Sequence, residues 1–138
     1  MKIKIDAVVF PSEENTISVI SDDDESKVGY ENPCHLYEVR NCLGFKDGKT
    51  EYKTENLEDP EDTQRIQFIQ KNEDGTIIPG VQSEQLILIV KHRLETMNKL
   101  FPCSENEKQL AGLEMYLEGC YNRVKNRIDR GVMGNLQK

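Results

Sequence analysis

The fold is decided by residues 83–131, which read SEQLILIVKHRLETMNKLFPCSENEKQLAGLEMYLEGCYNRVKNRIDRG. Apolar residues recur at three- and four-residue spacing from Leu86 to Phe101, and Pro102 then stops the run. This period is typical of an amphipathic helix, and Ser83 is its expected N-cap. The spacing therefore predicts a first helix from Ser83 to the residues just before Pro102.

A second helix follows almost at once. Ser104 with Glu107 three residues later has the spacing of a capping box. An apolar stripe then runs to Gly131 and comprises Leu110, Leu113, Leu117, Cys120, Val124 and Ile128. A helix of about 26 residues would be roughly 39 Å long. Because the turn between the helices is short, they should form an antiparallel helical hairpin.

The N-terminal part has the alternating apolar residues of short strands. The expected strands are Ile3–Ile5, Val8–Phe10, Ile17–Ile20, Leu36–Leu43 and Gln64–Gln70. Asp47-Gly48 and Asp74-Gly75 are strong hairpin signals, and Asp22–Glu25 suits a solvated acidic loop. We therefore predict an α+β fold in which an antiparallel β-sheet region (1–82) precedes the helical hairpin (83–138), all within a single domain (1–138).

Charge is unevenly distributed along the 138 residues. The chain has 18 basic and 25 acidic side chains, for a net charge of −7, but residues 83–138 alone carry 9 basic and 7 acidic ones. An acidic protein repels phosphate backbones at long range, which argues against binding to a nucleic acid polymer. A local arginine cluster can still hold a small anion.

Self-association is expected because only 36% of the residues are hydrophobic and Trp is absent. The long second helix exceeds what a sheet of this size can cover. Gly112 and Gly119 each cost about 1 kcal/mol against Ala in a helix, and a closely approaching second backbone would explain them. We predict a dimer or a larger assembly built from dimers, such as a hexamer of dimers. Loose local packing is the alternative for the glycines.

The chain is expected to be cytoplasmic and free of membrane segments. Its longest apolar run, Leu86–Val90, has five residues, and Met1–Lys4 lacks a signal peptide's apolar region. The four cysteines, Cys34, Cys42, Cys103 and Cys120, lack the spacing of a zinc site. We interpret them as packing residues and predict no metal site.

Arg123, Arg127 and Arg130 follow one another at four- and three-residue spacing, so they project from one side of the second helix. Their planar guanidinium groups suit phosphate, and a pyrophosphate matches two of them. The alternative is that they pair with the helix dipole and with acidic residues.

Glu105 and Asn106 lie in the first turn of the second helix, just after Phe101. An Asn amide can both donate to and accept from a nucleobase or ribose, and helix N-termini favour anions. Local capping is the simpler interpretation of both residues.

Catalysis has little support. His35 and His92 lie in different regions, and Cys103 has no histidine near it in the sequence. The sequence also lacks a Gly-x-Ser-x-Gly motif, a His-Glu-x-x-His motif and a glycine-rich phosphate loop. We therefore predict a non-enzymatic protein that needs no cofactor.

Several motifs from Ile66 to the C-terminus, about half of the chain, carry a resemblance to a known family. They are Ile66-Gln67-Phe68, Gly80-Val81, Ser83-Glu84-Gln85-Leu86, Ile89-Val90, Arg93-Leu94-Glu95, Cys103-Ser104-Glu105-Asn106, Leu110, Leu113-Glu114, Arg123, Arg127 and Arg130-Gly131-Val132-Met133-Gly134. Together they resemble the Thoeris anti-defence sponges of phages, which share a helical-hairpin domain with anti-CBASS sponges.

The chain also departs from that family. Met97 stands where many relatives have Phe, Gly119-Cys120 replaces Trp-Leu, Val124 replaces Thr after the first arginine, and Met133 replaces Glu. The turn before Cys103 is one residue shorter. The first 65 residues have no residue-by-residue match.

The resemblance implies that the protein binds and sequesters cyclic ADP-ribose isomers, such as glycocyclic ADP-ribose, without cleaving them. TIR enzymes of a bacterial defence system make these signals, so the protein would act in the cytoplasm of an infected cell. By the same resemblance, Asn106 contacts the nucleoside, Arg123 contacts the pyrophosphate, and Met97 takes the place of the aromatic that stacks on the base. Phe101, Glu105, Arg127 and Arg130 complete the candidate site, which a second chain would enclose.

Three other functions stay open at this point. The protein could bind the cyclic oligonucleotides of CBASS, which some relatives capture, instead of cyclic ADP-ribose isomers or in addition to them. An enzyme that degrades the signal would need a base and a nucleophile. A purely structural oligomerisation module would bind no ligand.

Overall fold

A computed structural model describes residues 2–5, 17–20, 35–53 and 62–131. The chain forms two compact units, residues 1–81 and 82–138. Their boundary lies next to Ser83, where charge and periodicity change in the sequence. Strands fill the first unit and two helices the second, which confirms the predicted α+β class and the order of its parts. That the two units act as a single domain stays a prediction.

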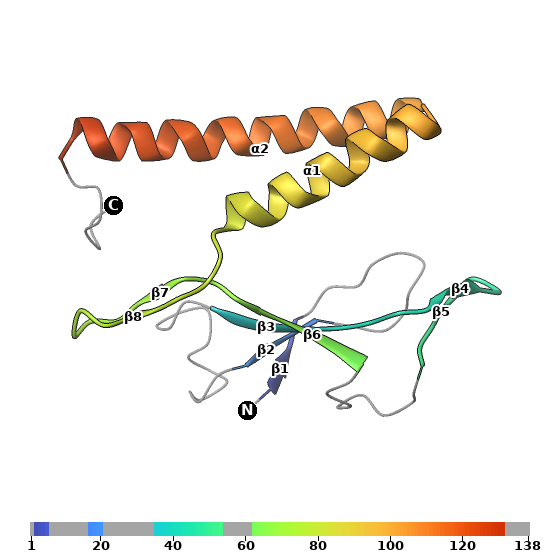
Figure 1. Ribbon diagram of the computed structural model, residues 1–138, viewed down its shortest axis with the longest axis horizontal. Coiled ribbons are helices and arrows are strands. Elements are labelled where there is room, and N and C mark those ends of the chain that lie inside the picture. The colour runs from blue at the N-terminus through green and yellow to red at the C-terminus, as the bar shows by residue number, and fades with distance from the viewer. Residues whose placement is uncertain (1, 6–16, 21–34, 54–61, 132–138) are drawn as a thin grey trace. The chain divides into compact units, whose positions relative to one another are not determined.

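The first unit contains a four-stranded antiparallel sheet (Figure 1). Its strands, in spatial order, are β1 (Lys2–Lys4), β2 (Ile17–Ile20), β3 (Leu36–Arg40) and β6 (Thr63–Gln67). The predicted strand Leu36–Leu43 ends early, at Arg40, because the Leu43 N–H donates to the Glu51 carbonyl at 2.8 Å, which belongs to a separate hairpin. The predicted Gln64–Gln70 strand is likewise divided at Phe68. The predictions for Val8–Phe10 and Asp22–Glu25 lie outside the described residues.

The strand register gives this sheet a mainly apolar face and a more polar face. Ile3, Val19, Tyr37 and Ile66 lie opposite one another across the four strands. Val19 is buried on this apolar face, and Tyr37 meets Phe68 edge to face with ring centroids 5.6 Å apart. Alternation of side chains therefore places the core of the first unit on this face.

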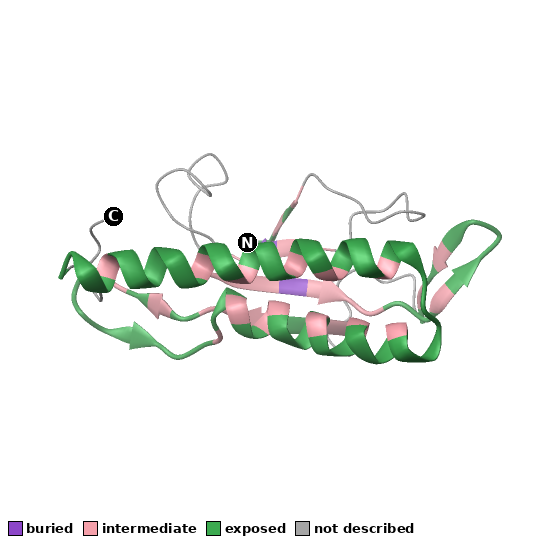
Figure 2. Cartoon of the chain, turned by 90° about the horizontal axis from the view of Figure 1, so that it is seen from above, coloured by how far each residue is buried: buried purple, intermediate pink, exposed green. Residues whose placement is uncertain are grey.

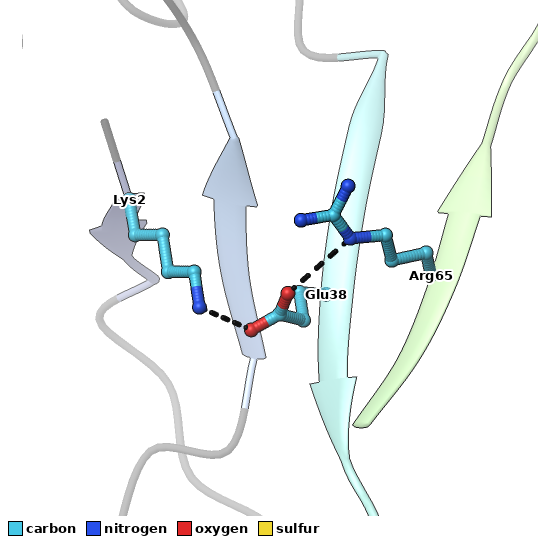
Figure 3. A network of polar contacts seen from close by, with 3 residues as sticks. All are labelled: Lys2, Glu38 and Arg65. Carbon is cyan, nitrogen blue, oxygen red and sulfur yellow. Dashed lines mark hydrogen bonds and ion pairs between the residues drawn. The ribbon is translucent and has the colours of Figure 1, made fainter. Parts of the chain in front are cut away.

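On the polar face, Glu38 is the centre of an ion-pair network (Figure 3). Its carboxylate lies 2.8 Å from the Lys2 Nζ and 3.5 Å from the Arg65 Nε. The Glu38 side chain is only 8% exposed, whereas the Arg65 side chain is 64% exposed. A buried carboxylate requires such partners, and here they tie β1 and β6 to the central strand β3.

We expect Glu38→Gln to lower the free energy of unfolding by about 1–3 kcal/mol, the usual cost of losing hydrogen bonds to a charged group in a buried site. Urea denaturation followed by circular dichroism measures this change. Glu51→Gln, at an exposed strand position, is the control and should stay within about 0.5 kcal/mol of the wild type. Equal stability of the two variants would contradict a structural role for the network.

Two hairpins extend from the sheet region (Figure 1). The first joins β4 (Gly44–Lys46) to β5 (Lys49–Glu51), and its turn residues Asp47 and Gly48 have φ of 53° and 74°. Positive φ at both positions defines a type I′ turn, which confirms the Asp-Gly signal. The second joins β7 (Gln70–Lys71) to β8 (Ile77–Ile78).

Gly80 passes very close to the strand that leaves β6. A Cβ at Gly80 would lie 2.5 Å from the Gln67 carbonyl oxygen and 2.5 Å from the Phe68 carbonyl carbon. The next residue, Val81, exchanges backbone hydrogen bonds with Gln67 and Ile69 at 2.9 and 3.0 Å. Only glycine allows this approach, because the atoms it meets are backbone atoms that cannot rotate away.

We expect Gly80→Ala to destabilise the protein by about 1–3 kcal/mol, the range for forced overpacking. Differential scanning calorimetry would detect a lower unfolding temperature. Gly112→Ala, measured at a protein concentration low enough to exclude self-association, is the control, because a Cβ there meets no atom of the described residues within 4 Å. A stability of Gly80→Ala equal to that of the wild type would contradict the close approach.

The second unit is an antiparallel hairpin of α1 (Ser83–Leu100) and α2 (Ser104–Asp129), as predicted. Its register is marked by the Asn98 amide, which donates to the Glu107 carboxylate at 2.6 Å, and by Lys91, 3.9 Å from the Glu114 carboxylate. At the far end, Gly131 has φ 72° and closes α2, which agrees with the predicted stop.

Both predicted helix caps are wrong by one residue. Gln82 is the N-cap of α1, and its N–H donates to the Gln85 side chain at 2.8 Å. Cys103 is the N-cap of α2, so the capping box of Ser104 and Glu107 does not form. The reason is that Glu107 accepts from Asn98 instead, and this contact draws the start of α2 toward α1.

Neither helix contains a fully buried residue (Figure 2). Leu110, Leu113, Leu117 and Cys120 of the predicted stripe are half-buried. Met115, on the opposite side of α2, is 73% exposed, and Ile128 near its end is 58% exposed. An amphipathic helix gains most of its stability from packing, so these faces are suited to a further surface. None of the described helices is both long and apolar enough to span a membrane.

Candidate ligand-binding site

Four of the predicted site residues meet at the tip of the hairpin, where α1 turns into α2. The Phe101 N–H donates to the Met97 carbonyl at 2.8 Å, and the Asn106 amide nitrogen donates to the Phe101 carbonyl at 3.2 Å. The Phe101 side chain is 70% exposed. Asn106 therefore closes the turn, as local capping would require, while Met97 and Phe101 present apolar surface beside it. We call Met97, Phe101, Glu105 and Asn106 the tip group.

Glu105 occupies the positive end of the α2 dipole. Its own backbone N–H, the Ser104 hydroxyl and the Cys103 thiol lower the pKa of its carboxyl by hydrogen bonding. The carboxylate therefore keeps its charge and takes the place that an external anion would occupy. This end of α2 suits an uncharged part of a ligand, such as a nucleoside, better than a phosphate.

The three arginines lie at the other end of α2. Because α2 has 26 residues and α1 has 18, α2 continues for about 12 Å beyond the start of α1 (Figure 1). Arg123 is exposed there and makes no hydrogen bond or ion pair with the described part of the chain. Arg127 is half-buried, and both Arg127 and Arg130 interact with other groups of the chain. Arg123 is thus the arginine best placed to bind an external anion.

One chain does not bring these two groups together. Asn106 and Arg123 are separated by 17 residues of continuous helix, or about 26 Å. A compact ligand pocket of the usual 300–1,000 Å³ measures no more than about 12 Å across. The predicted site residues therefore form two half-sites in each chain, one at the tip and one in the overhanging part of α2.

Tyr116 is a residue that the sequence prediction missed. It lies seven residues before Arg123 on α2 and is 44% exposed. Its hydroxyl lies near Cys120 and near Ser83 at the start of α1. A spacing of seven residues, two helical turns, places Tyr116 and Arg123 on the same side of α2, and this signal was available in the sequence.

Partial burial raises the pKa of Tyr116, and the nearby Cys120 raises this pKa further. A phenol with a raised pKa in the folded state holds its proton more tightly there than in the unfolded chain. Its contribution to stability is therefore present below the unfolded pKa of about 10 and is lost as the pH rises through the folded-state pKa. We expect the urea midpoint of the helical unit to fall above about pH 10, and to fall less in Tyr116→Phe. The same pH dependence in both proteins would contradict this assignment.

In the described part of the chain, the remaining reactive side chains form no recognisable centre. His92 is exposed on α1, and His35 belongs to the first unit. The prediction that the cysteines are packing residues is wrong for Cys42 and Cys103, which are exposed as free thiols, because Cys42 precedes a hairpin and Cys103 lies in the tip. Within the described ranges, no three His, Cys, Asp or Glu side chains are grouped as metal ligands.

Comparison with known proteins adds no relative. Neither the protein-family models nor the curated proteins include a match to this chain. The resemblance to phage sponges thus stays a prediction, and it rests on the motifs quoted from Ile66 onward and on the chemistry of the two half-sites.

Proposed function

We propose that this protein is a phage sponge that binds cyclic ADP-ribose isomers and withholds them from their effector without cleaving them. The observation that carries the proposal is the exposed Arg123 on the overhanging part of α2, which makes no hydrogen bond or ion pair with the described residues. The same hairpin carries an amide and two exposed apolar side chains at its tip. These are the groups that a nucleotide needs. The proposal places the protein in the cytoplasm of the infected cell.

The two half-sites match different parts of such a ligand. A cyclic ADP-ribose isomer carries about two negative charges on its pyrophosphate, and a guanidinium binds phosphate oxygens through two parallel hydrogen bonds. The nucleoside is neutral, flat and rich in donors and acceptors. It fits the tip group, where Glu105 keeps a negative charge and Asn106 offers an amide oxygen.

A second copy of the chain completes the site. If two α2 helices pair antiparallel, with the two-fold axis level with Glu114 and Met115, Asn106 of one copy lies level with Arg123 of the other. Support comes from the exposed Met115 and from Gly112 and Gly119, where a Cβ would meet no atom of the described residues of its own chain within 4 Å. A symmetric dimer of this kind contains two identical sites.

Sequestration by stoichiometry requires tight binding. A nanomolar dissociation constant corresponds to about −12.3 kcal/mol, and enclosure between two chains reduces the solvent that competes for the ligand's hydrogen bonds. A shared site offers that enclosure, whereas the tip or the arginines alone remain open to water.

Complementation between two variants tests the shared site. Asn106→Ala removes the amide from the tip, and Arg123→Ala removes the free guanidinium from the overhang. Each variant alone should fail to bind cyclic ADP-ribose in isothermal titration calorimetry. After mixing and subunit exchange, each mixed dimer should regain one intact site, so binding should return with up to one ligand per mixed dimer.

Binding by the wild type without any recovery in the mixture would contradict a site shared between chains. Displacement of bound cyclic ADP-ribose by a cyclic oligonucleotide in the wild type would show the second ligand class of the sponge relatives. If the wild-type protein binds neither ligand, a purely structural oligomerisation module would be the better account of its function.

A further inference from the structure

We propose that Tyr116 is the aromatic plate on which the base of the ligand stacks, in place of the aromatic ring that Met97 lacks. This inference rests on the proposed function and assigns a residue to the same site. It follows from the positions of the three described aromatic side chains of the helical unit, Phe101, Tyr116 and Tyr121, relative to Arg123.

Met97 is poorly suited to this role. Its thioether is polarisable but has no flat face, so it cannot match the area of a ring stacked on a purine. It also belongs to the tip group, which in the proposed dimer reaches Arg123 only from the second copy, because nearly the whole of α2 separates the two within one chain. Phe101 lies at the tip as well, so it too reaches the arginine only across the dimer.

Tyr116 instead shares a helix face with Arg123. Seven residues correspond to about 10.5 Å along the axis and a rotation of only about 20°. Tyr121 is closer in sequence, but two residues rotate it by about 200°, to the other side of α2. Among the described aromatic residues of this unit, Tyr116 is therefore the one that a ligand bound to Arg123 reaches along a single face.

The ring of Tyr116 is positioned for stacking. Its hydroxyl lies near Ser83 and Cys120, while 44% of the residue stays exposed. A phenol, with an ordinary pKa of about 10, is neutral at physiological pH, so the ring does not repel a pyrophosphate bound two turns away. An aromatic side chain has few rotatable bonds, so it loses little freedom when a base stacks on it.

Three variants test this assignment with cyclic ADP-ribose as the probe. Tyr116→Leu removes the ring, Tyr116→Phe keeps the ring without the hydroxyl, and Tyr121→Leu is the control from the other side of α2. Base–aromatic stacking affects affinity by about 5- to 150-fold. We expect Tyr116→Leu to weaken binding by about tenfold or more, and the other two variants to stay within about threefold of the wild type.

Tyrosine fluorescence gives a second readout that does not depend on Tyr116→Leu folding correctly. The chain has five Tyr and no Trp, so emission reports on tyrosines alone. The wild type and Tyr121→Leu should lose emission when the ligand binds. Tyr116→Phe should bind with nearly wild-type affinity and show a smaller loss.

Each outcome decides between specific accounts. Full affinity in a folded Tyr116→Leu protein, or an undiminished fluorescence change in Tyr116→Phe, would overturn the stacking role alone. Equal weakening in Tyr116→Phe and Tyr116→Leu would assign the effect to the hydroxyl and would also overturn it. A wild type that does not bind cyclic ADP-ribose would overturn the proposed function and this inference together.

Discussion

Arg123→Ala is expected to abolish the capture of cyclic ADP-ribose while leaving the assembly of the protein intact. Arg123 is exposed and makes no hydrogen bond or ion pair with the described residues, so its removal breaks no contact seen in the fold. Truncating one partner of an enclosed, hydrogen-bonded charge pair costs about 2–5 kcal/mol, which corresponds to about 30-fold or more in affinity. Isothermal titration calorimetry measures the loss, and size-exclusion chromatography with light scattering measures the assembly.

Lys125→Ala is the matched control. Lys125 is also exposed on the overhanging part of α2, and its removal changes the net charge by the same amount. Two residues along the helix rotate it by about 200°, away from Arg123. Equal loss of affinity in both variants would mean that the overhang attracts the ligand only by its overall charge, and an unchanged affinity in Arg123→Ala would remove this residue from the site.

The second large effect, on dimerisation and ligand binding, is expected from changing both Gly112 and Gly119 to alanine. Within one chain this double variant should be harmless or favourable, because no atom of the described part of the chain lies within 4 Å of either new Cβ. Alanine also favours a helix by about 1 kcal/mol over glycine at each position. If α2 pairs closely with a second α2, the added methyl groups push the two backbones apart. We therefore expect a weaker dimer and a parallel loss of ligand binding.

Sedimentation equilibrium measures the dimer constant of this double variant, and thermal unfolding at low protein concentration measures the chain itself. If the double variant is more stable than the wild type and dimerises as tightly, the glycines reflect loose packing. That result would contradict the proposed α2 pairing.

Much of the fold could be predicted from the sequence because its signals are local. The three- and four-residue spacing before Pro102 and the stop at Gly131 define both helices, and the Asp47-Gly48 pair defines a hairpin. The caps could not be predicted, because the contact between Asn98 and Glu107 joins two helices and has no signature in either one. The close approach at Gly80 is likewise a property of the folded chain.

The site was predicted as a list of residues and not as an arrangement in space. Residue type and the family resemblance predict Asn106 and Arg123 as nucleotide ligands, but the length of α2 places them near opposite ends of one continuous helix. The separation of 17 positions was present in the sequence, and it points to two half-sites rather than one. Tyr116 is absent from that list because the family resemblance assigns the stacking position to Met97, whereas Tyr116 follows only from the helical period around Arg123.

The central claim, that the protein holds a cyclic nucleotide intact, is tested most directly by recovering the ligand. Purified protein is mixed with the products of a TIR enzyme, separated from free molecules by filtration and then boiled, and the released molecules are identified by mass spectrometry. The account predicts intact cyclic ADP-ribose in the boiled fraction of the wild type and none in that of Arg123→Ala. If all of the intact signal is recovered in the filtrate of the wild type, the account is contradicted. Recovery of the signal as cleaved products would also contradict it.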